Sequence, residues 1–148
     1  MVTKIGFSGS QEGMSDSQKV RFLSRYLFLK RTLGGDIEFH QGQCIGADHE
    51  ALLLAKSQGG VWTVSHPPTD QSKVHDVECD EVWPAKPYLE RNHDIVDATD
   101  YLIFAPKTRH EQLRSGTWAT YRYAKLMRKN ILMLHPDELP FSYLSDSQ

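Results

Sequence analysis

Short apolar runs alternate with longer amphipathic segments along nearly the whole chain. The runs end in glycine, proline or polar residues, as buried strands do, and they cover residues 4–9, 36–42, 61–66, 100–106 and 130–136, with a short additional strand expected at 80–84. The segments with helical periodicity cover residues 15–33, 46–60, 87–99 and 115–129. Regular alternation of strands and helices predicts an α/β fold in which helices cover both faces of a mostly parallel sheet.

The segment 15–33 has clear helix boundary signals. Ser15 and Gln18 have the spacing of a capping box, and the pair Gly34-Gly35 ends the helix. We expect one apolar stripe on this helix to face the core, made of Val20, Leu23, Tyr26, Leu27 and Leu33.

The size and composition of the chain favour a single domain. The 148 residues, 39% of them hydrophobic, are enough to bury a core. No repeat or linker divides the chain, so we expect one domain over residues 1–137 and a polar tail over 138–148. The apolar runs are too short to span a bilayer, and the N-terminus lacks a secretory pattern. Because two cysteines are too few for a disulfide scaffold, a cytoplasmic location without membrane attachment is expected.

Positive charge is concentrated late in the chain. Residues 107–129 contain seven Lys and Arg against one acid, whereas the remaining residues contain ten against eighteen acids. Such a segment is typical of a local anionic ligand, and equally of a solvated helix face. The charge pattern alone leaves both interpretations open.

Small and polar residues follow the predicted strands, at the edge where parallel sheets bind ligands. Ser8, Gly9 and Ser10 end the first strand, and His66 ends the third. The first turn resembles half of a dinucleotide-binding loop without matching its full glycine pattern. A tight turn that requires glycine is the alternative explanation.

The tripeptide Ser115-Gly116-Thr117 stands directly before a predicted helix and after Arg114. A helix N-terminus offers unpaired N–H groups and a partial positive charge, so it can bind phosphate. The alternative is a plain serine N-cap. The adjacent arginine and the strand-end position favour the phosphate site.

Two further groups of residues are candidates at the same edge. Gly46 and Asp48 open the second helix, where the carboxylate could accept ribose hydroxyl groups or only cap the helix, and Glu50 follows one position later. Arg91 and Asn92 lie in the third helix, where the guanidinium could bind phosphate through two parallel hydrogen bonds or pair with nearby acids.

The sequence does not predict a metal ion or a resident cofactor. His75 with Cys79, and Cys44 with His49, lack the paired ligand pattern of a zinc site. No G-x-S-x-G motif is present to hold the nucleophile of a hydrolase triad.

Four stretches together resemble the SLOG superfamily: "FSGS", "HQGQCIGADHEALLLA", "RNHDIVDATDYLIFAP" and "RSGTWATYRYA". This group includes the lonely-guy (LOG) phosphoribohydrolases and the DNA-processing protein A (DprA) family, and the sequence is more similar to the DprA-like branch. The resemblance covers residues 4–136. It implies a Rossmann-like three-layer α/β/α fold and a nucleotide-type ligand, with ligand contacts from Gly9, Ser10, Gly46, Asp48, Arg91 and Asn92 and phosphate contacts from Ser115, Gly116 and Thr117.

The sequence departs from the LOG pattern at one informative point. Where LOG enzymes have glutamates after Gly-Thr, this chain has Trp118, Ala119 and Thr120. Our leading hypothesis is therefore binding of a nucleotide or a nucleotide-derived small molecule. The second is hydrolysis or transfer at a nucleotide N-glycosidic bond, with Arg91, Asp48 or Glu50 as catalytic candidates.

A third hypothesis is that the chain binds single-stranded nucleic acid, as DprA-like proteins do. Trp118, Tyr121 and Tyr123 would then be stacking surfaces. Packing of Trp118 and Tyr121 within the protein is the favoured explanation, and the acidic remainder of the chain disfavours a broad nucleic-acid surface. A symmetric homodimer through the helix at 15–33 or at 115–129 is also expected.

Overall fold

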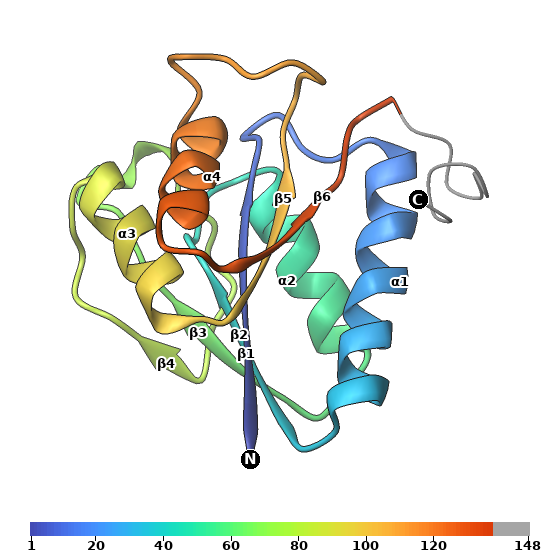
Figure 1. The fold of residues 1–148 in the computed structure, drawn as a ribbon. Coiled ribbons are helices and arrows are strands. Elements are labelled where there is room, and N and C mark those ends of the chain that lie inside the picture. Colours follow the sequence, from blue (N-terminus) through green and yellow to red (C-terminus); the bar gives the residue numbers. More distant parts are fainter. Residues whose placement is uncertain (138–148) are drawn as a thin grey trace.

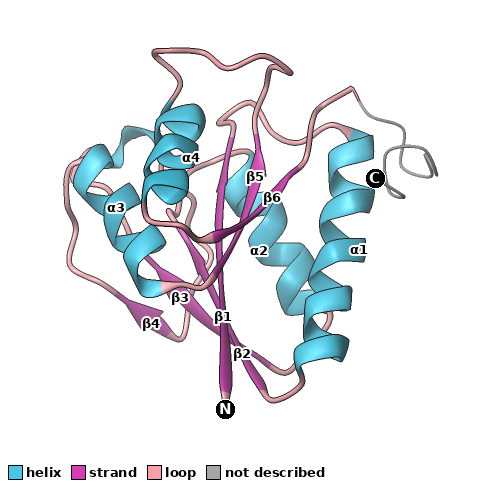
Figure 2. Cartoon of the chain, viewed as in Figure 1, coloured by secondary structure: helices cyan, strands magenta, loops and turns pink. Residues whose placement is uncertain are grey.

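The computed structural model describes residues 1–137, and in that part of the chain six parallel strands form one sheet with helices on both faces (Figures 1 and 2). The strands are β1 (Val2–Gly9), β2 (Asp36–Gln41), β3 (Val61–Ser65), β4 (Glu81–Val82), β5 (Tyr101–Ala105) and β6 (Asn130–Met133). The helices are α1 (Asp16–Leu33), α2 (Ala47–Ser57), α3 (Tyr88–Ala98) and α4 (Gly116–Leu126), with a 3₁₀ turn at Gln71–Lys73. The predicted α/β fold with three layers is confirmed.

The strand order β4-β3-β2-β1-β5-β6 changes direction between β1 and β5. The chain first adds β2, β3 and β4 on one side of β1, and then crosses to add β5 and β6 on the other side. Helices α1 and α2 cover one face of the sheet, and α3 and α4 cover the other (Figure 2). A reversal of this kind opens a crevice at the carboxyl ends of the two central strands.

Strand β5 shows why the central strands consist of continuous apolar runs. Ile103 packs in the cluster beneath α1 and α2, whereas Leu102 and Phe104 pack in the cluster beneath α3 and α4. Since side chains alternate across a strand, a sheet covered on both faces requires apolar residues at successive positions. On β1, a Cβ atom at Gly6 would lie 2.7 Å from Leu102 and 3.1 Å from Ile95, so glycine lets α3 approach the sheet.

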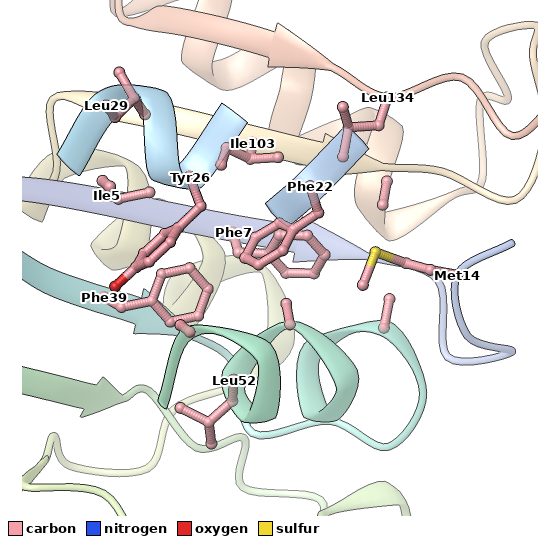
Figure 3. Packing of buried hydrophobic residues seen from close by; sticks show 14 of the residues in the cluster. Ile5, Phe7, Met14, Phe22, Tyr26, Leu29, Phe39, Leu52, Ile103 and Leu134 are labelled. Atoms are coloured by element: carbon pink, nitrogen blue, oxygen red, sulfur yellow. The ribbon is translucent and has the colours of Figure 1, made fainter. Parts of the chain in front are cut away.

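The core beneath α1 is built from aromatic rings (Figure 3). Phe22 meets Phe7 edge-to-face with ring centroids 5.5 Å apart, and Tyr26 meets Phe39 edge-to-face at 6.0 Å. Edge-to-face pairs place the positive edge of one ring against the negative face of the other. These four rings fasten α1 to β1 and β2.

The predicted apolar stripe on α1 is confirmed in part: Tyr26 is fully buried, and Leu27 and Leu33 are partly buried against the core cluster. Val20 is 43% exposed, and the buried positions of the helix are Gln18, Arg21, Phe22, Tyr26 and Leu29. Because Gln18 and Arg21 are polar, a pattern that counts only apolar residues does not identify the complete buried face of the helix. The capping box at Ser15 and Gln18 is present as predicted.

The other predicted elements form with small changes of boundary, and the expected short strand at 80–84 is the two-residue β4. No helix within residues 1–137 is long and apolar enough to cross a membrane. The predicted tail, 138–148, lies outside the described residues.

We expect Gln18→Leu to destabilise the protein by about 2–4 kcal/mol, because the buried amide donates to the carbonyl oxygens of Pro106 and Leu134 at 2.8 Å each. Both acceptors would be left buried without that donor. The measurement is urea unfolding, with Gln71→Leu as the control because the exposed Gln71 also donates to one carbonyl, that of Pro68. Equal stability of Gln18→Leu and the native protein would contradict this account.

Candidate ligand-binding site

A cavity of about 690 Å³ lies at the carboxyl ends of the central strands. Four segments line it: the end of β1 with the following loop, the loop that leads into α2, the first turns of α3, and the β5–α4 loop with the first turn of α4. Its position is the crevice expected from the reversal of strand order between β1 and β5. Its volume lies within the usual range for small-molecule sites.

Most of the residues proposed from the sequence come together around this cavity. Those that line it are Ser8, Gly9, Ser10, Asp48, Arg91, Asn92, Arg114, Ser115, Gly116 and Thr117. Three other candidates, Gly46, His66 and Glu50, are not part of the lining. Each of these three residues makes contacts elsewhere in the protein.

Gly46 joins the loop after β2 to the loop after β1. It has a φ of +85°, and a Cβ atom there would collide with the backbone carbonyl of Gln11. The next residue, Ala47, donates its N–H to the Ser10 carbonyl at 2.9 Å. Glycine is needed here because two loops meet backbone to backbone.

Glu50 faces the start of α1 instead of the cavity. Its carboxylate accepts a hydrogen bond from the Met14 N–H at 2.6 Å and pairs with the Lys19 ammonium at 3.2 Å. These contacts hold the segment between β1 and α1, so the side chain has a structural partner on each oxygen.

Asp48 is a buried carboxylate at the floor of the cavity. Its Oδ2 accepts N–H bonds from Gly42 at 3.1 Å and Cys44 at 3.4 Å. Burial raises the pKa of this carboxyl from 3.8 to about 6, although the Arg91 charge and the N–H donors oppose that change. A group with this pKa can hold or release a proton near neutral pH.

Arg91 is 5% exposed and uses its guanidinium mainly on the protein's own backbone. Nη1 donates to the carbonyl oxygens of Gly42 and His66, the latter at 3.1 Å, and Nη2 contacts the Cys44 sulfur at 3.5 Å. Nε is buried and has no hydrogen-bond partner among the described residues. Nη1 therefore ties the segments after β2 and β3 together, and Nη2 contacts the loop between β2 and α2.

The first turn of α4 carries the tripeptide Ser115-Gly116-Thr117. The Ser115 hydroxyl oxygen accepts the Trp118 N–H at 3.3 Å, so this serine is the N-cap of the helix. The amides of Gly116 and Thr117 have no intrahelical acceptor because they lie in the first turn. Nothing lies within 4 Å of the Cβ position at Gly116, so this backbone is open to a close approach.

Two cationic side chains line the cavity on the same loop. Lys107 pairs with Glu12 across the cavity mouth at 2.6 Å. Arg114 is exposed, and the ion pairs found within residues 1–137 do not include it. Arg122, by contrast, braces the loop by bonding Glu111 at 2.6 Å and the Leu113 carbonyl at 3.2 Å.

Trp118 packs inside the protein, as favoured from the sequence. It is 5% exposed, its ring meets Tyr121 edge-to-face at 5.3 Å, and its indole N–H donates to Thr108 at 3.3 Å. The indole therefore supports the loop above the cavity and offers no exposed face for stacking a base.

His66 lies behind the cavity in a buried chain of side-chain hydrogen bonds. His40 Nε2 lies 3.0 Å from the Glu38 carboxylate, and His40 Nδ1 lies 2.8 Å from His66 Nε2. Because His40 donates to the carboxylate through Nε2, its neutral ring accepts at Nδ1 from the His66 Nε2–H. Burial lowers the pKa of His66 from 6.5 to about 3 and also lowers the pKa of His40.

The sequence reasoning missed an apolar part of the lining, which consists of Phe7, Tyr88 and Ile95. Tyr88 lies three residues before Arg91, and Ile95 lies four residues after it. Helical spacing places these side chains on one face, so the identification of Arg91 could have indicated both neighbours.

The structure is similar to two solved structures of proteins named for the molybdenum cofactor. One is the molybdenum cofactor binding protein from the phototrophic bacterium Rippkaea orientalis, with a TM-score of 0.69, 21% identity, and coverage of 100% of this chain and 87% of that chain. The other is the Moco carrier protein from Chlamydomonas reinhardtii, with a TM-score of 0.62, 19% identity, and coverage of 99% and 82%. At these identities the likeness establishes a shared Rossmann-like fold.

No protein-family model matches the sequence, and no curated protein is significantly similar to it.

Acidification from pH 6.5 to pH 4 is expected to lower the free energy of unfolding. His66 and His75, with pKa values of about 3 and about 4, stay neutral in the folded protein while the unfolded chain binds protons below 6.5. Asp48 acts in the opposite direction between 3.8 and about 6, because the folded state holds the extra proton. Two histidines outweigh one carboxyl, so stability is lost as the pH falls.

Urea unfolding at a series of pH values measures this dependence. His66→Asn should flatten it by up to about 1.4 kcal/mol per pH unit, since one titrating group is removed. Asp48→Asn should steepen it, because the opposing group is removed. An unchanged slope in His66→Asn would contradict the assignment.

Proposed function

We propose that this protein binds a small ligand in which a planar heterocycle carries a phosphate, of the nucleotide or nucleotide-derived kind, at the carboxyl ends of its parallel strands. The observation that carries the proposal is the convergence of ten residues chosen from the sequence on one cavity of about 690 Å³. The phosphate would be held at the first turn of α4. There the free amides of Gly116 and Thr117, the helix dipole and the charge of Arg114 favour an anion.

The sequence resemblance to the SLOG superfamily supports the same ligand class. Within that group, the features of the cavity fit a binding protein of either the LOG-like or the DprA-like branch. The buried position of Trp118 makes single-stranded nucleic acid a weaker candidate than a small molecule, because the indole has no free stacking face.

The molybdenum cofactor, for which the structural neighbours described above are named, is a specific candidate of this ligand class. It is a pterin phosphate that carries the metal, so its heterocycle and phosphate match an apolar wall and a cationic loop. The residues present fit such a group: Arg114 and the amides of α4 would hold the phosphate, while Tyr88 and Ile95 border the apolar side. When bound, the group would supply redox chemistry, and this chain would hold and shield it.

The binding proposal is tested by titrating the purified protein with AMP, CMP, ADP-ribose, cyclic dinucleotides and molybdopterin in a calorimeter. Arg114→Ala is expected to weaken phosphate-bearing ligands about tenfold or more, because it removes a charge-assisted contact. Thr117→Val should also weaken them through loss of its hydroxyl.

Arg109→Ala is the matched control for charge. Arg109 lies in the same exposed loop and pairs with Asp137 at 3.1 Å, but it does not line the cavity. Binding of none of these ligands to the native protein would refute the proposal, as would equal losses in the Arg114 and Arg109 variants.

A second candidate function, hydrolysis of a nucleotide N-glycosidic bond, is favoured by one observation. Asp48 lines the cavity, and its carboxyl has a pKa raised to about 6, which suits a residue that transfers a proton. Among the catalytic candidates from the sequence, Glu50 is the least suitable, because its carboxylate is engaged by Met14 and Lys19.

Chromatography of AMP and CMP incubations measures release of the free base. If the protein is a hydrolase that uses Asp48, Asp48→Asn should lower the rate at least 100-fold, on the order of general acid–base catalysis. Glu50→Gln serves as the control and should retain activity. Release of no base by the native protein leaves binding as the function.

A further inference from the structure

The lining of the cavity has a polar, cationic part and an apolar part, which come from different segments of the chain. The β5–α4 loop and the first turn of α4 contribute cations, hydroxyl groups and free amides, whereas β1 and α3 contribute the side chains of Phe7, Tyr88 and Ile95. Phe7 and Ile95 are almost fully buried, and Tyr88 is half-buried. A ligand that satisfies both sides must have an anionic end and an apolar end.

Tyr88 occupies a well-defined place at the apolar side. It is the first residue of α3, directly after Pro87, whose fixed φ sets the start of the helix. The guanidinium carbon of Arg91 lies 5.2 Å from the centroid of its ring. Because Arg91 is itself held by Gly42, His66 and Cys44, the ring packs against a fixed support.

Asn92 lies one turn further along α3 and also lines the cavity. Its amide makes no hydrogen bond to the part of the chain that the structure describes. A side-chain amide offers both donors and an acceptor, which complements the polar edge of a heterocycle. Residues i and i+4 lie on the same helix face, so a ring beside Tyr88 would have its edge near Asn92.

We propose that Tyr88 selects for a ring-bearing ligand: the planar heterocycle packs against the Tyr88 ring, and its phosphate end lies at the first turn of α4. The proposal rests on the proposed ligand-binding function and adds the residue that distinguishes a heterocyclic ligand from a simple sugar phosphate. Offset packing of aromatic rings is favourable and tolerates different bases. Tyr88 is thus a specificity-determining residue outside the phosphate site.

The test compares two probes that share a phosphate: AMP, which has a heterocycle, and ribose 5-phosphate, which lacks one. The native protein should bind AMP more tightly. Tyr88→Leu should weaken AMP about tenfold, the order of effect found when stacking on an aromatic side chain is lost. It should leave the Kd for ribose 5-phosphate within about twofold of the native value.

Tyr88→Phe keeps the ring and should retain native binding of AMP. Leu89→Ala is the control on the same turn, because Leu89 is 60% exposed and lies outside the lining. Thermal unfolding checks that each variant is folded, and Tyr88→Phe supplies a readout if Tyr88→Leu does not fold.

The inference is overturned if Tyr88→Leu weakens both probes equally or neither, if Tyr88→Phe loses affinity for AMP, or if the native protein does not bind AMP. Binding of another ligand of the panel would then leave the proposed function standing. Failure of the whole panel would remove both.

Discussion

The architecture of the site depends on the backbone of Gly42, which is hydrogen-bonded on both sides to buried charged groups. Its N–H donates to the buried Asp48 carboxylate, and its carbonyl accepts from the Arg91 guanidinium. A Cβ atom at this position would collide with Arg91 and lie 3.0 Å from Asp48, so only glycine allows both groups to close on the backbone. Gly42, directly after β2, thereby links Asp48 of α2 with Arg91 of α3, although these two helices cover opposite faces of the sheet.

This connection explains how a buried arginine and a buried carboxylate are tolerated. Each charge would be costly in an apolar interior, and each is offset by oriented backbone dipoles and by the field of the other. Arg91 also reaches the His66 carbonyl, which extends the connection to β3. The strand ends that form the floor of the cavity are therefore fixed before any ligand arrives, and a preorganised site loses less entropy on binding.

The sequence predicted the sheet and the edge at which the cavity lies, because both follow from repeated patterns. Apolar runs alternate with amphipathic segments, and unusual residues, such as Ser10, Gly46 and Gly116, lie after a strand or at the start of the helix that follows it, at one edge of the sheet. It predicted the local capping contact of Ser15 with Gln18, but it could not predict side-chain contacts with residues distant in the sequence. The guanidinium of Arg91 donates to backbone carbonyls, Gly46 allows two loops to meet, and the buried amide of Gln18 donates to a distant carbonyl, because each contact is set by tertiary neighbours.

The position of Asp48 bears on the choice between binding and catalysis. Its Oδ2 atom accepts two backbone N–H groups, and a carboxylate so engaged stabilises the loop that forms the floor. Burial makes the ionised form of Asp48 costly and raises its pKa to about 6. The backbone N–H groups of Gly42 and Cys44 and the charge of Arg91 oppose this effect and stabilise the carboxylate. A ligand phosphate would add a further negative charge to a cavity that Asp48 and Glu12 already line. The free amides of α4 and the charge of Arg114 lie on a different segment from Asp48, so an anion held there, as proposed, would lie on another segment than the buried carboxylate.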